Sequence, residues 1–320
     1  MDVEVLLVLQ ELREAGGPVL EHAAALVTEL GSGTLCLVAV LVVYWAVDKR
    51  LGASLALSFG IGSLVVQALK VTVCCYRPWV RDPRVVPSEL AVDGATGYSF
   101  PSGHSQQAAS VWGGVAAGGR GPAWLRVAPW ALVALVGLSR CLLGVHTPQD
   151  VLAGLAVGVA SVWAGRALWR AVEDEPSRDL AVALAGALAA AGLVAYALLR
   201  PYPVDRVGGG LLVDPVEMQT DCFRAAGIVL GTLAGWLGER RLVDFDTDAA
   251  PAALRAWRVA AGVACLLAVV LVVQPALIGA LGERWGYLAT YVVVGLAGML
   301  GAPAAVEAAW YAARRRRAGR

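Results

Sequence analysis

Residues 259–282 read VAAGVACLLAVVLVVQPALIGALG, and this charge-free stretch decides the fold class. A helix needs about 20 predominantly apolar residues to cross the hydrocarbon core of a bilayer. Further runs of this kind are 30–47, 51–69, 180–199 and 285–306, together with 94–119 if its helix starts near Ser102, after a polar first third. The shorter runs 127–139, 151–165 and 225–238 reach spanning length when flanking arginines extend to the interface. The sequence therefore predicts about nine transmembrane helices.

The composition also indicates a membrane protein. Of the 320 residues, 58% are hydrophobic and 16% are charged, whereas soluble domains average about 45–50% apolar and about 25% charged residues. This excludes a disordered chain and a soluble two-domain enzyme. The formal net charge of +1 argues against a nucleic-acid partner. We expect an all-α, polytopic helical membrane protein that is surrounded by the lipid bilayer.

The basic residues give the expected orientation. Cytoplasmic segments of membrane proteins are enriched in Lys and Arg, and the arginine run 314–317 belongs on that side. With nine crossings, the N-terminus then faces the opposite side. Residues 1–30 carry acidic side chains among Val and Leu at helical spacing. This pattern predicts an amphipathic helix on the outer membrane surface rather than a removable signal peptide.

Three clusters of polar residues lie beside the predicted spans on the outer side, and the first is Lys70 with Arg77-Pro78. On a continuous helix, a gap of seven residues returns to within about 20° of the same face. We therefore expect Lys70 and Arg77 to point the same way. Two converging cations suit a dianion such as a phosphoryl group. As an alternative, both residues are interfacial anchors at a helix end.

The second cluster is the run 98–105, YSFPSGHS, at the expected start of the third span. Pro101, Ser102 and Gly103 favour a helix N-terminus, where free backbone N–H groups and the helix dipole make an anion-binding site. His104 is placed to exchange a proton beside these amides. An ordinary capped helix start with a chance histidine is the alternative.

The third cluster consists of SR at 139–140 and HTPQD at 146–150. Thr147 and Asp150 have the spacing of a capping box, with Pro148 at the first helical position. This geometry puts Asp150 one turn after His146, so its carboxylate can hold one imidazole nitrogen and leave the other free to attack. As an alternative, Asp150 only caps the helix, although one carboxylate can both cap the helix and hold His146.

Together the three clusters indicate phosphoryl chemistry. Lys70, Arg77 and Arg140, with the helix-end amides, can stabilise the oxyanion that develops in phosphoryl transfer. His104 and His146 can divide the roles of general acid and nucleophile. The six cysteines show no metal-ligand spacing, so we expect no metal and no cofactor.

These residues resemble the signature of the type 2 phosphatidic acid phosphatase superfamily, K-x6-RP, PSGH and SR-x5-H-x3-D, and every signature position matches. The resemblance covers roughly residues 50–170. It implies that His146 attacks phosphorus to give a phosphohistidine, that Asp150 orients His146, and that His104 protonates the leaving oxygen. The phosphate-binding residues that it implies are Lys70, Arg77, Ser102, Gly103 through its amide, and Arg140. It further implies that no metal is needed.

The resemblance also suggests a division of the chain. We expect an interfacial helix over 1–30, a phosphatase core with the three signature blocks over 31–171, and further transmembrane helices over 172–320. In the predicted layout, one span precedes the helix of the first block and four follow the helix of the last. This layout is similar to the glucose-6-phosphatase and sphingosine-phosphate phosphatase branches of the superfamily.

We expect a metal-independent phosphatase of the plasma (inner) membrane, with its site on the extracytoplasmic face and a lipid phosphate monoester or pyrophosphate as substrate. The alternatives are a sugar-phosphate phosphatase, a lipid phosphotransferase, and a transporter or scaffold that retains the site. The sequence leaves open whether the substrate is phosphatidate, an isoprenyl phosphate or pyrophosphate, a sphingoid phosphate or a sugar phosphate. It also leaves the oligomeric state open. The outer loop 200–221 is long enough to cover the site, and we expect specificity to lie there.

Overall fold

The computed structural model describes residues 2–118, 122–207 and 210–318, which are mostly helical. In chain order the elements are α1 (Asp2–Glu29), α2 (Gly33–Val42), η1 (Val43–Val47), α3 (Lys49–Val73), α4 (Pro78–Arg81), α5 (Glu89–Val92), α6 (Gly103–Ala108), η2 (Ala109–Gly113), α7 (Gly114–Gly118), α8 (Trp124–Leu142), α9 (Pro148–Val172), η3 (Pro176–Arg178), α10 (Asp179–Leu199), β1 (Arg206–Val207), β2 (Gly210–Leu211), α11 (Pro215–Leu242), α12 (Ala252–Ala268), η4 (Val269–Val273), α13 (Gln274–Leu281), α14 (Glu283–Leu296), η5 (Ala297–Gly301) and α15 (Ala302–Ala318). The short π-helical turns η1, η2, η4 and η5 continue their neighbouring helices, η3 is a 3-10 turn, and β1 pairs with β2 in an antiparallel hairpin.

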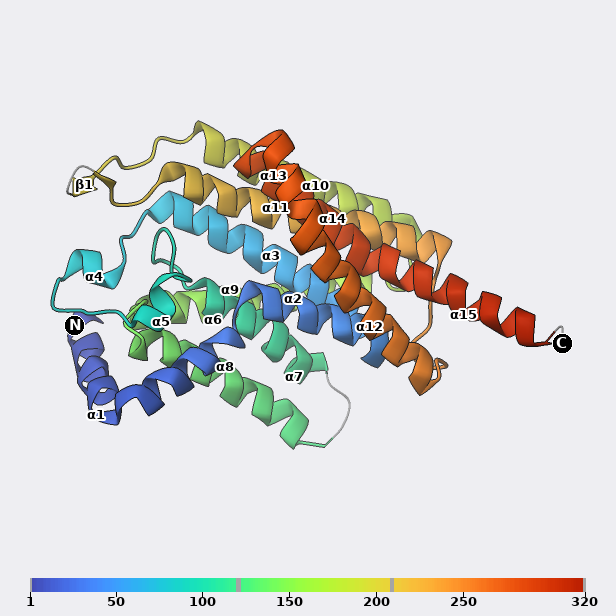
Figure 1. Ribbon diagram of the computed structural model, residues 1–320, viewed down its shortest axis with the longest axis horizontal. Helices are drawn as coiled ribbons and strands as arrows, with labels where there is room; N and C mark the ends of the chain where they lie inside the picture. The colour runs from blue at the N-terminus through green and yellow to red at the C-terminus, as the bar shows by residue number, and fades with distance from the viewer. Residues whose placement is uncertain (1, 119–121, 208–209, 319–320) are drawn as a thin grey trace.

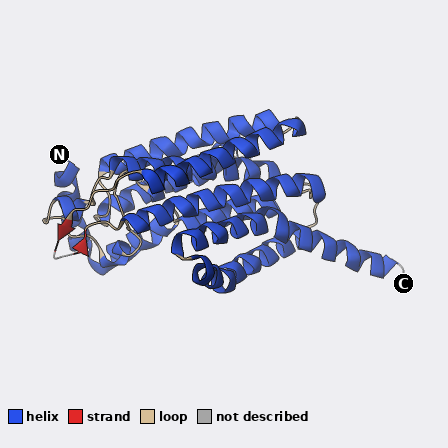
Figure 2. Cartoon of the chain, turned by 90° about the horizontal axis from the view of Figure 1, so that it is seen from above, coloured by secondary structure: helices blue, strands red, loops and turns tan. Residues whose placement is uncertain are grey.

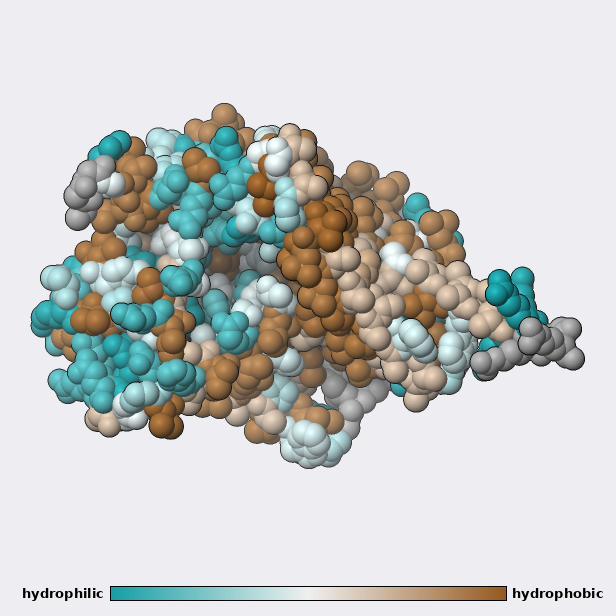
Figure 3. All heavy atoms as spheres, in the orientation of Figure 1, coloured by the Kyte–Doolittle hydropathy of each residue, from teal (hydrophilic) through white to brown (hydrophobic). Residues whose placement is uncertain are grey.

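The long helices run side by side along the longest axis of the molecule (Figure 1). The N-terminus, α4, α5 and the β1–β2 hairpin lie at one end, which we call the outer end, and α15 projects from the opposite end (Figures 1 and 2). Hydrophilic residues gather at the outer end and near the tip of α15, and hydrophobic residues cover much of the face between them (Figure 3). This distribution fits a bundle that crosses a bilayer along its long axis.

The polytopic helical class is confirmed, whereas the count of nine crossings is not. Within the described ranges, six helices are long and apolar enough to span, and α1 joined to α2–η1 adds a seventh that is bent by 50°. The predicted spans at 102–119 and 225–238 are helical over residues 103–118 and 225–238 but do not meet this criterion, and residue 119 lies outside the described part. The first forms only the short stretch from α6 to α7, and the second belongs to α11, whose two ends carry charged residues.

The N-terminal segment forms α1, as expected for an amphipathic helix. Its backbone breaks at Gly17, where φ is +59° and the next residue is Pro18. Because proline cannot continue the helical hydrogen bonding and glycine tolerates positive φ, the pair explains this break within α1, which is separate from the 50° bend between α1 and α2. Ion pairs join Asp2 to Arg81 and Glu4 to Arg84 at the outer end. The location of α1 at a membrane surface stays a prediction.

Glycines bring the long helices unusually close together. A Cβ on Gly154 or Gly158 of α9 would collide with the backbone of Ser102 or Gln106, so these glycines allow α9 to pack directly against the start of α6. On α11, Gly227, Gly231 and Gly235 repeat every fourth residue and face α14. Such small-residue spacing is typical of closely packed membrane helices.

This packing makes Gly231 a sensitive position. A Cβ there would lie well inside van der Waals distance of the Val292 carbonyl oxygen, which belongs to the backbone of α14 and cannot move aside freely. We expect Gly231→Ala to lower the free energy of unfolding in detergent by about 1–3 kcal/mol. Denaturant unfolding followed by circular dichroism measures this.

Gly192 on α10 provides the matched control, because a Cβ there meets no atom within 4 Å among the described residues. We expect Gly192→Ala to leave stability unchanged or to raise it slightly, since alanine restricts the unfolded chain. Equal destabilisation by the two substitutions would contradict the close-packing account of α11 and α14.

Candidate active site

His146 and Asp150 form the pair that the sequence predicts. Thr147 caps α9, its side chain accepts a hydrogen bond from the Asp150 amide, and Pro148 takes the first helical position. Oδ2 of Asp150 accepts a hydrogen bond of 2.8 Å from the Thr147 amide and lies 3.6 Å from Nδ1 of His146. The capping box and the one-turn spacing are thus confirmed, and one carboxylate serves both.

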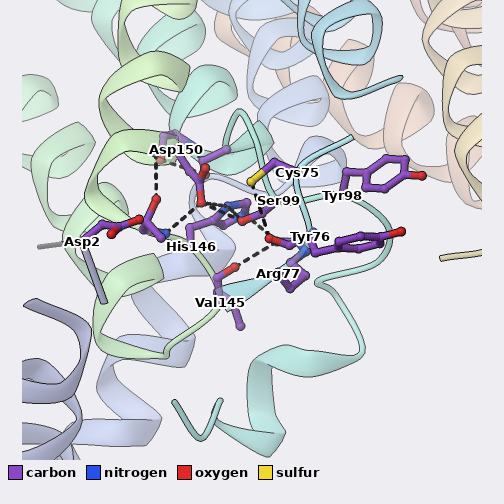
Figure 4. A network of polar contacts seen from close by, with 12 residues as sticks. Asp2, Cys75, Tyr76, Arg77, Tyr98, Ser99, Val145, His146 and Asp150 are labelled. Carbon is purple, nitrogen blue, oxygen red and sulfur yellow. Dashed lines mark hydrogen bonds and ion pairs between the residues drawn. The ribbon is translucent and has the colours of Figure 1, made fainter. Parts of the chain in front are cut away.

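Ser99 completes this pair, and sequence reasoning missed it. Its hydroxyl donates to Oδ2 of Asp150 over 2.6 Å and lies 3.4 Å from Nδ1 of His146. Its amide donates to the carbonyl of Cys75 over 2.7 Å, which fixes the segment that precedes α6. Figure 4 shows Ser99, His146, Asp150 and Arg77 gathered in one network. The only sequence signal was the position of Ser99 two residues before Pro101.

The other imidazole nitrogen faces Arg77. Nη1 of Arg77 lies 2.9 Å from Nε2 of His146. Because a guanidinium can only donate, Nε2 accepts and the proton of the neutral ring sits on Nδ1, toward Asp150. Burial lowers the pKa of His146 well below its usual range, and the charge of Arg77 acts in the same direction. His146 is therefore neutral near pH 7, with its Nε2 lone pair directed at a cation.

Lys70 and Arg77 converge, but not in the way that helical spacing predicts. The helix α3 ends at Val73, because Cys74 adopts a left-handed conformation with φ of +51°, and Arg77 caps the separate helix α4. The expectation of one continuous helix face is therefore wrong. The two side chains meet instead at the turn 96–98, where Nζ of Lys70 donates to the Tyr98 carbonyl over 3.0 Å.

Arg77 contacts the same turn and the residue before His146. Its guanidinium donates to the carbonyl oxygens of Thr96 over 2.6 Å, Gly97 over 3.1 Å and Val145 over 3.0 Å. The guanidinium plane is thus fixed by backbone acceptors rather than by a carboxylate. This orientation holds Nη1 against His146.

Arg140 approaches from the last turn of α8. Its Nη1 donates to the Thr28 hydroxyl of α1 over 3.0 Å, and both side chains are buried. The positive charges of Arg140 and Lys70 also lower the pKa of His146, as does His104. No salt bridge joins Lys70, Arg77 or Arg140 to a carboxylate within residues 2–118, 122–207 and 210–318. The cluster therefore has excess positive charge.

The predicted helix start is present as well. Ser102 is the N-cap of α6, and its hydroxyl accepts hydrogen bonds from the amide and the hydroxyl of Ser105. Its amide donates to the Asp150 carbonyl over 2.9 Å, which ties the start of α6 to α9. Open space surrounds the position of a Cβ on Gly103. The Gly103 and His104 amides are the first of the helix, where N–H groups have no partner within the helix.

The predicted specificity loop 200–221 also reaches this region, although residues 208–209 lie outside the described part. The Met218 sulfur accepts from the Tyr98 amide and occupies the space beside Gly97, where φ is +62° and a Cβ would collide with it. Tyr76 donates a hydrogen bond of 2.6 Å to the Asp205 carboxylate. The loop thus contacts the turn that receives Lys70 and Arg77, and its role in specificity stays a prediction.

The arrangement combines a buried neutral imidazole with excess cationic charge. In the described ranges, no group of three or more His, Cys, Asp or Glu side chains is placed to hold a metal ion. The side chains present can bind an anion at the cations and the α6 amides, and can present Nε2 of His146 to it.

Comparison with known proteins gives two family matches. Residues 51–174 match the PAP2 superfamily, and residues 223–312 match the PAP2 superfamily phosphatase transmembrane extension. The chain is 32% identical over 110 residues to an undecaprenyl-diphosphatase from Sulfolobus acidocaldarius, an alignment that covers 34% of this chain and 51% of the relative. The chain thus spans about half the length of this curated relative. No solved structure matches the chain.

Proposed function

Because the chain belongs to the PAP2 superfamily, we propose that it is a multi-pass membrane phosphatase that hydrolyses a lipid phosphate through a phosphohistidine. The observation that carries this proposal is the contact between Arg77 and Nε2 of His146 in a buried cluster of unneutralised cations. A phosphoryl dianion among these cations would take Nη1 of Arg77 onto its own oxygens, which would free the Nε2 lone pair for attack. The name of the relative, an undecaprenyl-diphosphatase, supports a lipid phosphate or diphosphate over a sugar phosphate.

The first step transfers the phosphoryl group to the enzyme. Nε2 of His146 forms a bond to phosphorus, the bond from phosphorus to the lipid oxygen breaks, and His104 in its protonated form gives that oxygen a proton. Burial and the nearby cations lower the pKa of His104, whereas a bound phosphoryl dianion favours its charged form. Asp150 holds Nδ1–H and stabilises the positive charge that forms on the ring. Lys70, Arg77 and Arg140, with Ser102 and the Gly103 amide, stabilise the developing oxyanion.

The second step releases phosphate. His104, now neutral, takes a proton from water, the water oxygen attacks phosphorus, and the bond to Nε2 breaks. An alcohol in place of water would give phosphotransfer from the same intermediate. The chemistry requires no cofactor, because the fixed cations supply the charge that a metal would otherwise provide.

We also propose that the site faces the extracytoplasmic side of the plasma (inner) membrane and that the C-terminus is cytoplasmic. The candidate site lies at the outer end, whereas the basic C-terminal helix α15 projects from the opposite end (Figure 1). The positive-inside rule places such a basic end in the cytoplasm. Reporter fusions to the two termini test this orientation.

His146→Ala should remove the nucleophile and lower kcat for phosphate release by a factor of about 10³ or more. Phosphate release from lipid phosphates in EDTA measures this. Rapid quenching of wild-type protein should trap a phosphoryl group that is labile in acid and stable in base, and mass spectrometry should place it on residue 146.

His22 provides the matched control, because it is an exposed histidine on α1 outside the site. His22→Ala should retain full activity. Normal turnover by His146→Ala, or a strict need for a divalent metal, would contradict the mechanism.

Ser99→Ala should lower kcat by about 10–100-fold with little change in KM, as found for groups that orient a reacting residue. The hydroxyl holds the Asp150 carboxylate against His146 and does not reach the proposed phosphate position. The control is Ser88→Ala, since the Ser88 hydroxyl is buried and has no hydrogen-bond partner among the described residues. Equal losses of kcat in Ser99→Ala and Ser88→Ala would contradict the orienting role of Ser99 and leave it a packing role only.

A further inference from the structure

A cavity of about 480 Å³ lies between the helices of the candidate site and the C-terminal helices. Its lining comes from α2, α3 and α6 on one side and from α11, α12–η4–α13 and α14 on the other. Figure 3 shows a hollow on this face, between the hydrophilic outer end and a hydrophobic ridge. The volume is typical of a pocket for a small ligand.

The cavity begins where the cation cluster ends. Thr96 lines it, and the carbonyl of the same residue accepts a hydrogen bond from Arg77. Gln67 lines it one turn before Lys70 on α3, and Gln107 lines it one turn after His104 on α6. A ligand whose phosphate occupies the cation cluster and whose remaining part passes Thr96 would enter this cavity.

The lining changes from polar to apolar with depth. Near the outer end it carries several polar side chains, and we call five of them the collar: Gln67, Gln107, Asp221, Arg224 and Gln274. Deeper in the bundle it becomes mainly apolar. The deep residues are Leu37, Phe59, Ile228, Leu266 and Val294. Phe59 lies eight residues before Gln67 on α3, about 12 Å along the helix. Ile228 lies four residues after Arg224 on α11, about 6 Å along the helix, so the apolar part starts about 6–12 Å from the collar.

On the basis of the proposed phosphatase function, we propose that this cavity binds the non-reacting part of a lipid phosphate that carries a hydroxyl group close to its phosphate. The hydrocarbon chain occupies the apolar depth, and the hydroxylated carbons lie at the collar. The matched extension 223–312 then has a function of its own, because it supplies most of one wall, including Arg224, Leu266 and Val294.

The charges of the collar favour hydroxyl groups over the alternatives. Asp221 and Arg224 form an ion pair of 2.9 Å, and the guanidinium also stacks on the ring of Tyr287. A bare hydrocarbon at this level would remove water from this ion pair and from the amide groups of the collar without replacing their hydrogen bonds, which is costly. A second phosphate would meet the Asp221 carboxylate. A hydroxyl donates to the acid or amide oxygens and accepts from the N–H groups.

Binding of the hydrocarbon chain is tested with a substitution that fills the cavity. Ala225 lines it and is buried, so Ala225→Leu adds bulk where the chain should pass. This variant should lower kcat/KM at least about tenfold for 1-hexadecyl-glycerol 3-phosphate, and less than about twofold for p-nitrophenyl phosphate. Ala260→Leu, at an exposed position on α12, should change neither value. Equal effects of Ala225→Leu on both substrates would overturn the assignment.

The collar is tested with substrates of equal chain length. Wild-type protein should prefer 1-hexadecyl-glycerol 3-phosphate over hexadecyl phosphate and hexadecyl diphosphate by about tenfold in kcat/KM. The double substitution Asp221→Ala with Arg224→Ala removes both charges without leaving one unpaired, and should reduce the preference to within about twofold. A wild-type preference for either unhydroxylated substrate would overturn the hydroxyl assignment.

A binding measurement separates this inference from the proposed function. If no substrate, including p-nitrophenyl phosphate, releases phosphate, the proposed function fails. The melting temperature of the protein, measured with and without hexadecyl phosphonate, still reports on binding in the cavity, because a bound ligand raises it. Wild type should be stabilised and Ala225→Leu should not. Equal stabilisation of both would place the chain outside the cavity.

Discussion

Three buried cations without acidic partners are the constraint on which the outer half of the structure depends. Lys70, Arg77 and Arg140 are almost fully buried, and an uncompensated buried charge is costly. The chain lowers this cost with backbone carbonyls, which accept from Lys70 and Arg77 at the turn 96–98 and at Val145. The excess charge remains and favours an anion. The neutral His146 is held at the same point, so the group that neutralises the cluster also meets the nucleophile.

The rest of the bundle supports this cluster from several directions. Gly154 and Gly158 let α9 approach the start of α6, which places the capped helix end beside Asp150. The N-terminal helix, outside the matched family region, supplies Thr28 to Arg140 and Arg13 to the carbonyls of Val86 and Leu142. The C-terminal helices close the opposite side and leave the cavity between themselves and the core.

Local patterns predicted the parts of the site that depend on short spacings. The capping box at Thr147, the step from His146 to Asp150 and the cap at Ser102 follow from backbone geometry that a few residues determine. The break at Cys74 was not predictable, because a non-glycine residue with positive φ has no sequence signal. Ser99 and Thr28 were missed because neutral hydroxyls attract attention only through their tertiary partners. The span count was not confirmed at α11, which combines membrane length with charged ends, because the absence of charge in a stretch of sequence does not decide whether such a helix crosses the membrane.

The central claim is that the cations form a site for a phosphoryl dianion, and anion binding tests it without turnover. Isothermal titration of the purified protein with orthovanadate should show one saturable site. Arg140→Gln should weaken orthovanadate binding by about 10–100-fold, which corresponds to the loss of one charge-assisted hydrogen bond. The control Arg170→Gln, at the exposed end of α9, should leave the affinity unchanged. Absence of saturable binding, or equal affinity in wild type and Arg140→Gln, would contradict the account.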